Sequence, residues 1–188
     1  MISLTLLSFL FTVDVFLVKH FFDETSAGLY VAAALIGKII FFASFAIPQV
    51  MFPKSVERHY LNKPSKKILK KSLFLVFLIS LPITIFYFLF PELTAIILFG
   101  KQYLEITNLL GLFGIAISLF SISYILVLYN LSINKINFIY FLIFSVVLEV
   151  ILINFIHDSI YEVLLILTSI LGLVFLYLIY HTLIKKII

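Results

Sequence analysis

The chain has 188 residues, of which 64% are hydrophobic and only 12% are charged, whereas soluble domains carry roughly 25% charged residues. This composition indicates an integral membrane protein. The formal net charge of +4 does not indicate nucleic-acid binding, because the basic residues gather in one loop and at the C-terminus, beside apolar runs. There is no cysteine, so disulfides and thiolate metal sites are excluded.

Long apolar runs without strand-type alternation predict an all-α membrane bundle rather than a barrel. A helix of about 20 residues crosses ~30 Å of hydrocarbon, so the chain has room for about six spans. We therefore expect one domain, residues 1–188, with six transmembrane helices. The predicted spans cover residues 2–22, 27–52, 68–90, 104–130, 137–156 and 160–184.

The first two predicted spans form a hairpin that carries two of the three ionisable residues inside apolar runs, Asp14 and Lys38. A charge near the middle of a spanning helix costs a few kcal/mol on insertion, so such residues usually face the bundle interior and mark function. On the first span, a hydroxyl face lies roughly 150° from Asp14, which predicts an internal helix. We expect Asp14 and Lys38 to pair; a purely structural salt bridge is the alternative to a functional role. The hydroxyl face consists of Thr5, Ser8 and Thr12.

Two prolines are candidate hinges. Pro48 is expected to remove the hydrogen bond to the Ser44 carbonyl and to kink the second span, and Pro53 is expected to end that span. Pro82 lies inside the third span. Helix punctuation is the alternative to a hinge role for Pro48, and likewise for Pro53.

Small residues three or four positions apart recur along three spans and predict faces where neighbouring backbones approach closely. In the fourth span they form a continuous stripe, which a helix-packing seam explains better than a substrate groove. The small residues are Gly28, Ala32, Ala33 and Gly37 in the second span, Gly111, Gly114, Ser118 and Ser121 in the fourth, and Thr168 and Gly172 in the sixth.

Glu149, in the fifth span, is the third ionisable residue inside an apolar run. It lies one turn after Ser145 and on the same helix face. Glu149 is a candidate proton-coupling residue. The alternative is a carboxyl that is simply hydrogen-bonded by Ser145 or by a neighbouring helix.

The loop from Lys54 to Lys71 holds seven of the thirteen basic residues. The turn after the fourth span adds one and the C-terminus adds Lys185 and Lys186, against Lys19 and Lys101 on the other side. Because cytoplasmic loops carry an excess of Lys and Arg, we expect this loop and both termini to be cytoplasmic. The protein is expected to be a multi-pass protein of the cell membrane.

The order of features from Val13 to Lys54, VDVFLVKHF, then AGLYVAAALIGKIIFF, then AIPQVMFPK, resembles the start of the second six-helix lobe in prokaryotic polysaccharide flippases. Those proteins belong to the multidrug/oligosaccharidyl-lipid/polysaccharide exporter superfamily. The resemblance implies half of a two-lobe fold that moves a polyprenyl-diphosphate-linked oligosaccharide by alternating access. It implies that Lys38 and Asp14 engage the diphosphate or a coupling ion. The implied partners are the lipid bilayer, the polyprenyl-linked glycan and a second six-helix lobe, either a second copy or a separate chain.

Other interpretations stay open. The half-length also suits an inactive fragment, a non-transporting assembly subunit or a half-transporter of the multidrug-exporter type. A membrane enzyme would need an acid–base or metal-binding cluster, and the best candidates are His20 with Asp23 and Glu24, followed by His157 with Asp158. Neither cluster has a second histidine at metal-ligand spacing, so both are expected to be solvated loops. We expect a non-enzyme without cofactor or metal.

Overall fold

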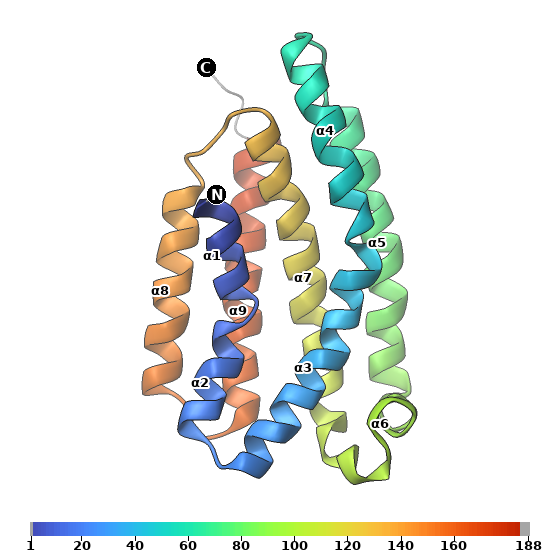
Figure 1. Ribbon diagram of the computed structural model, residues 1–188, viewed down its shortest axis with the longest axis vertical. Helices are drawn as coiled ribbons and strands as arrows, with labels where there is room; N and C mark the ends of the chain where they lie inside the picture. The colour runs from blue at the N-terminus through green and yellow to red at the C-terminus, as the bar shows by residue number, and fades with distance from the viewer. Residues whose placement is uncertain (1, 185–188) are drawn as a thin grey trace.

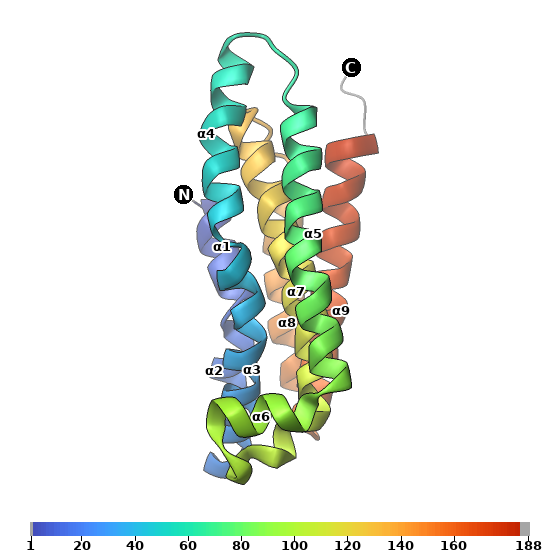
Figure 2. The same cartoon turned by 90° about the vertical axis from the view of Figure 1, so that its right-hand side faces the viewer.

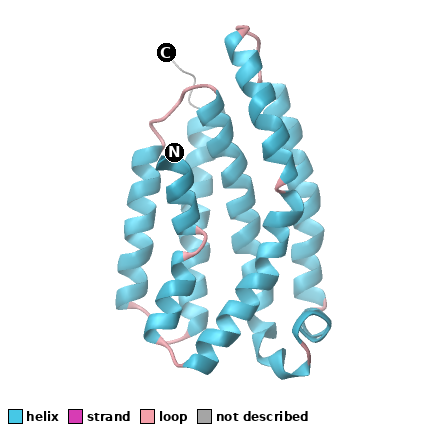
Figure 3. Ribbon diagram, viewed as in Figure 1, coloured by secondary structure: helices cyan, strands magenta, loops and turns pink. Residues whose placement is uncertain are grey.

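The computed structural model describes residues 2–184, and these residues form helices joined by short turns, without a strand (Figure 3). The predicted all-α class is confirmed. Most helices run along one long axis (Figure 1). The elements are α1 (Ile2–Leu10), α2 (Val13–Phe21), α3 (Glu24–Ser44), α4 (Ala46–Tyr60), α5 (Lys66–Leu89), α6 (Pro91–Phe99), the 3₁₀ helix η1 (Lys101–Ile106), α7 (Thr107–Ser132), α8 (Ile139–Phe155), α9 (Ile160–Ile179) and the π-helical turn η2 (Tyr180–Ile184).

Four segments within residues 2–184 are long and apolar enough to cross a membrane on their own. The pair α1 and α2 qualifies as a fifth span only when taken together, because each helix has nine residues, and the two are bent by 42°. Helix α8 is apolar but has 17 residues, fewer than the ~20 that a span needs. The protein therefore has four or five candidate spans, and the sixth stays a prediction. The four segments are Glu24–Ser44, Lys66–Leu89, Lys101–Ser132 and Ile160–Thr182.

The basic residues are distributed unequally between the two ends of the bundle. The α4–α5 loop and the α7–α8 turn lie at one end, whereas α6 and the α2–α3 and α8–α9 turns lie at the other (Figure 1). Lys185 and Lys186 lie outside the described residues. The arrangement agrees with the charge pattern of the sequence, and the cytoplasmic orientation of the basic end stays a prediction.

The first predicted span is not one continuous helix. Between α1 and α2 the turn tightens, and the Thr12 N–H bonds the Phe9 carbonyl at 3.0 Å, only three residues back. The Thr12 hydroxyl donates to the Ser8 carbonyl at 2.8 Å, a contact that bends helices. The restart at Val13 places Asp14 in the first turn of α2, where the helix dipole favours a negative charge.

The second predicted span is also divided. Helix α3 ends at Ser44, and α4 begins at Ala46 and extends to Tyr60. Pro48 lies in the first turn of α4, where its missing N–H would have no helical partner, so the predicted break near Pro48 is confirmed. The predicted end of the helix at Pro53 is wrong. Helix α4 continues through Pro53 because it packs along α5 and α7, which offsets one lost backbone hydrogen bond.

A helix that the sequence did not predict lies between the third and fourth spans. Helix α6 lies across the end of the bundle instead of along it (Figure 2). Pro91 opens α6 with a preset φ angle, and Gly100, at φ +91°, ends it in a conformation that favours glycine. Helix α6 has nine residues, too few to give a span-length signal in the sequence.

Helix α7 is the centre of the bundle, where it packs against α3, α4, α5 and α9. The small-residue stripe of α7 faces α5, and a side chain at Gly111 would collide with the Phe88 ring. The Thr84 hydroxyl donates to the Gly114 carbonyl at 3.1 Å and lies 2.9 Å from the Ser118 hydroxyl. The predicted helix-packing seam is therefore confirmed for these residues.

The close helix approach predicted from the small residues of α3 is found at one of its two glycines and not at the other. A Cβ atom at Gly37 would lie 2.9 Å from the Cβ of Phe113 in α7, so the predicted close approach is confirmed there. A Cβ atom at Gly28 would meet no atom within 4 Å, and the same holds at Gly172 in α9. Close approach is therefore wrong at Gly28 and Gly172.

Asp23 caps the N-terminus of α3 and accepts hydrogen bonds from the N–H groups of Thr25 and Ser26 at 3.0 and 3.1 Å. Hydrogen bonds from Ser26 are the main reason that the pKa of Asp23 lies below its ordinary value, and the bond from the Thr25 N–H adds to the effect. The stabilisation by this carboxylate is present above the ordinary pKa and is lost as the pH falls through the lowered pKa, below about pH 4.

In detergent, Asp23→Ala should lower the melting temperature at pH 7, and the melting temperature of this variant should fall less steeply with acid than that of the wild type. Glu24→Ala, which removes no cap hydrogen bond, should keep the wild-type profile; an unchanged profile for Asp23→Ala would refute the role of the cap.

Candidate functional site

Two carboxyl groups are buried where α2 packs between α3 and α8. The exposed fraction is 1% for Asp14 on α2 and 0% for Glu149 on α8. Tyr30, fully buried on α3, donates its hydroxyl to Asp14 Oδ2 at 2.9 Å. Asp14, Tyr30 and Glu149 are called the acidic cluster below. Two consecutive helices, α2 and α3, and the distant α8 therefore place ionisable groups in one apolar interior.

Most of the carboxylate oxygens in the acidic cluster have no hydrogen-bond partner. Asp14 Oδ1 and both Glu149 oxygens are buried without a partner in the described part of the chain. Both carboxyl groups are buried on helices that pack against each other, α2 and α8. Because a buried unpaired carboxylate costs several kcal/mol, native proteins keep such groups mainly where they exchange a proton or bind an ion.

Ser145 does not satisfy Glu149. Its hydroxyl donates to the Phe141 carbonyl of its own helix at 2.8 Å. The alternative in which Ser145 hydrogen-bonds Glu149 is therefore wrong, because the serine is closer to its own backbone than to the carboxyl one turn later. Glu149 is left as the only polar side chain of the acidic cluster without a hydrogen bond among residues 2–184.

Lys38 is half-buried on α3, and its Nζ atom lies 4.5 Å from the centre of the Phe11 ring. Asp14 uses one oxygen for Tyr30 and leaves the other unpaired, so the predicted ion pair between Asp14 and Lys38 is not formed. The two opposite charges attract each other only at longer range. Lys38 follows Tyr30 by eight residues, about 12 Å along the helix, and therefore faces the α1–α2 break instead of Asp14.

An aromatic cluster surrounds this lysine contact. Phe11 lies 5.0 Å from Phe41 and 4.7 Å from Phe120, measured between ring centres. Phe41 also contacts Tyr124 and Phe45, with ring centres 5.3 and 5.4 Å apart. Composition and hydropathy do not single out these aromatic residues. Their spacing of four within Phe41/Phe45 and Phe120/Tyr124 was the available signal, since such pairs share a helix face.

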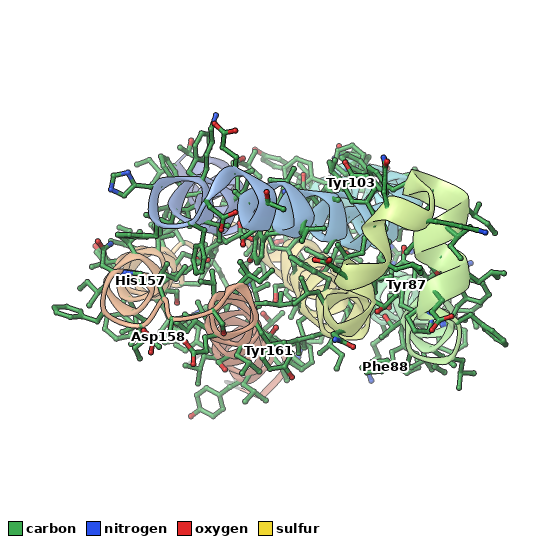
Figure 4. All side chains as sticks on the ribbon, turned by 90° about the horizontal axis from the view of Figure 1, so that it is seen from below. Tyr87, Phe88, Tyr103, His157, Asp158 and Tyr161 are labelled. Atoms are coloured by element: carbon green, nitrogen blue, oxygen red, sulfur yellow. The ribbon has the colours of Figure 1, made fainter. Side chains whose placement is uncertain are left out.

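The two histidine-containing turns serve in packing and capping. His157, in the turn after α8 (Figure 4), stacks on Phe21 of α2 with ring centres 4.2 Å apart, a contact that the expectation of a solvated loop missed. Asp23 caps α3. Within residues 2–184, no group of three or more histidine or acidic side chains could hold a metal ion.

The Tyr30–Asp14 hydrogen bond gives a direct stability test. Tyr30→Phe should destabilise the folded protein by about 1–3 kcal/mol, because it leaves the buried Asp14 carboxyl without a partner. The double variant Asp14→Leu with Tyr30→Phe removes both polar groups and should lose less than the sum of the single changes. Tyr87→Phe is the matched control, because Tyr87 (Figure 4) bonds the Ile36 carbonyl at 2.8 Å instead. Thermal unfolding in detergent measures the differences; additive losses for Tyr30 and Asp14 would show that the pair is not coupled.

Neither the characterised proteins nor the solved structures contain a match to this chain. Residues 1–108 match a protein family described as polysaccharide biosynthesis protein. The match covers more than half of the chain, from α1 through α6 and η1, and includes Asp14, Tyr30 and Lys38 but not Glu149. Together with the apolar helices, it shows that the chain is a multi-pass membrane protein that belongs to the polysaccharide biosynthesis protein family.

Proposed function

We propose that this chain is one six-helix lobe of a flippase that moves a polyprenyl-diphosphate-linked oligosaccharide across the cell membrane. The observation that carries the proposal is a set of unpaired, buried carboxylates in an apolar helix bundle whose family serves polysaccharide biosynthesis. A flippase moves its lipid-linked sugar without breaking a covalent bond, so the proposed function needs no cofactor or metal.

Lys38 is the contact for the substrate diphosphate. Its ammonium group is half-buried against an aromatic ring instead of being neutralised by a carboxylate. A cation in this setting keeps its positive charge available for a phosphate oxygen, while the ring face offsets part of the lost hydration. The adjacent aromatic cluster offers flat apolar faces to sugar rings and prenyl groups.

Asp14 and Glu149 are the coupling residues. They are buried on α2 and α8, two helices that pack against each other, where two negative charges would repel. Binding of a proton or a small cation removes that repulsion and favours a closed interior, and its release favours an open one. The α1–α2 break and the prolines Pro48 and Pro82 are the places where the helices can bend during this exchange.

A second six-helix lobe completes the transporter. A single lobe provides one wall of a central cavity, whereas alternating access moves one repeat against another around the substrate. The second lobe is either another copy of this chain or a separate polypeptide. Orientation with both termini in the cytoplasm follows from the basic loop between α4 and α5.

Flipping can be tested in reconstituted vesicles with a fluorescent polyprenyl-diphosphate oligosaccharide, with and without the six-helix partner. We expect flipping only when two lobes are present, and a loss of at least about tenfold for Lys38→Met, as for the loss of a charged contact. Lys70→Met, which changes an exposed lysine on α5, should keep the wild-type rate. Flipping by a demonstrated monomer, or a fully active Lys38→Met variant, would refute the proposal; inactivity in every combination favours an inactive fragment or an assembly subunit.

A half-transporter of the multidrug-exporter type is the second candidate. The observation that favours it is a buried interior that contains carboxyl oxygens without a hydrogen-bond partner and, separately, a set of aromatic rings, two features that suit an organic cation. Transport of a fluorescent organic cation, abolished by Glu149→Gln, together with no flipping of the glycan lipid, would select this candidate.

A further inference from the structure

A cavity of about 810 Å³ lies between α4 and α5, near the loop that joins them. Its charged lining consists of four basic side chains, Lys54, Arg58, Lys63 and Lys71, against one acid, Glu57. The lining therefore attracts anions. The acidic cluster and Lys38 belong to α2, α3 and α8, so this cavity is separate from the proposed transport site.

The remaining lining of the cavity is apolar. Val50 and Leu75, with exposed fractions of 55% and 36%, form part of its wall, and the buried Met51 lies beneath them. The neighbouring α5 residues Phe74 and Leu78 are 63% and 55% exposed, so this wall continues into a strongly apolar helix surface. A soluble anion would use the basic residues and leave the apolar wall uncovered, whereas a lipid uses both.

The loop between the two helices fixes part of the basic lining. The Lys63 N–H bonds the Arg58 carbonyl at 2.8 Å, and Asn62 adopts a positive φ of 51°, the pattern of a Schellman cap. Arg58 Nη1 donates to the Pro64 carbonyl at 3.0 Å, which orients the guanidinium and leaves further N–H groups for an anion. Ser72, buried in the wall, carries a further hydroxyl that can donate to an anion.

We propose that this cavity binds an anionic phospholipid of the bilayer, with its phosphate held by Lys54, Arg58 and Lys71 and one acyl chain along Val50 and Leu75. Basic pockets between membrane helices bind anionic headgroups through this combination of charge and apolar wall. The bound lipid links α4 to α5, so it stabilises the outer part of the bundle. The proposal does not depend on the transported substrate.

The absence of tryptophan from the chain makes a site-specific test possible. Leu75→Trp places a single fluorophore in the cavity wall, Val50→Trp places one on the opposite helix, and Phe74→Trp reports the ordinary lipid beside α5. Each variant is reconstituted in phosphatidylcholine vesicles that contain about one tenth phosphatidylglycerol, with bromine on one or the other lipid. At the two cavity reporters, we expect brominated phosphatidylglycerol to quench the fluorescence more than its fraction of the bilayer lipid would give. At the Phe74→Trp reporter, the quenching should match that fraction.

Charge variants show whether the cavity lysines cause this preference. Lys54→Gln with Lys71→Gln should weaken the preference by roughly tenfold or more, because each basic residue near the surface strengthens the attraction about fivefold. Lys67→Gln with Lys70→Gln removes the same charge from exposed positions outside the cavity and should keep the preference.

Several results would overturn the proposal. Equal quenching by both brominated lipids at Leu75→Trp and Val50→Trp would show that the cavity does not select an anion. Loss of the preference on adding inorganic phosphate would identify a free-anion site, and displacement by stoichiometric polyprenyl diphosphate would assign the cavity to the substrate. Weak quenching by both lipids at the cavity reporters alone would show that protein covers the cavity.

Discussion

Replacement of Glu149 by leucine is expected to stabilise the protein and to abolish transport at the same time. Both oxygens of this carboxyl group are buried without a hydrogen-bond partner in the described chain. An apolar side chain of similar volume removes two unsatisfied polar atoms, so the free energy of unfolding should rise by about 1–3 kcal/mol. Flipping should fall at least about tenfold, because the proposed coupling group is gone.

The opposite signs of these two effects separate a functional carboxyl from a structural one. Thermal unfolding in detergent and flipping in two-lobe vesicles are the two measurements. Glu149→Gln should lose flipping without the gain in stability, because the amide is as poorly satisfied as the acid. Ser145→Ala, one turn away and bonded to its own backbone, should change neither measurement strongly. A destabilised Glu149→Leu variant would show that the carboxyl has a structural partner and would refute this interpretation.

Addition of a single methyl group to α3 should have opposite effects at its two glycines. Gly37→Ala puts a Cβ atom 2.9 Å from the Cβ of Phe113, a fully buried residue of α7, so the α3–α7 contact must open. We expect a loss of about 1–3 kcal/mol, as for overpacking in other cores. Gly28→Ala meets open space and should stabilise α3 by about 0.5–1 kcal/mol, because alanine favours the helix.

Unfolding of both variants in the same detergent gives the comparison. Similar destabilisation by both changes would mean that the effect comes from the helix backbone and not from the α3–α7 contact. A neutral Gly37→Ala variant would show that Phe113 can move aside at no cost.

The sequence predicted the elements that depend on local properties of the chain. Composition and the long apolar runs are enough for an all-α membrane protein, and the isolated charges Asp14 and Glu149 are enough to predict burial. Spacing of small residues predicted close approach equally at Gly28 and Gly37, since the pattern contains no information about the opposing surface. Only the position of α7 decides between them.

The details of the site depend on the tertiary arrangement. Asp14 and Lys38 have opposite charges, yet Tyr30 takes the place of the lysine because Tyr30 lies at the level of Asp14 on α3, whereas Lys38 lies about 12 Å further along the helix. Lys38 meets Phe11 because the first span is broken after Leu10, and that break arises from hydroxyl contacts that a hydropathy pattern does not register. The aromatic cluster likewise brings together three regions of the chain.

The break between α1 and α2 separates the residues around Lys38 from those around Asp14. Phe11, which shields Lys38, lies at the break, whereas Asp14 and its bond to Tyr30 lie beyond it. Under the proposed function, a swing of α1 about the break would uncover the lysine while the carboxyl stays buried, so phosphate capture and ion exchange would be two separate steps. Crosslinking α1 to α3 across Lys38 should then block access to the lysine and leave ion exchange at the acidic cluster unchanged. Loss of both would mean that α1 and α2 move together as one rigid unit.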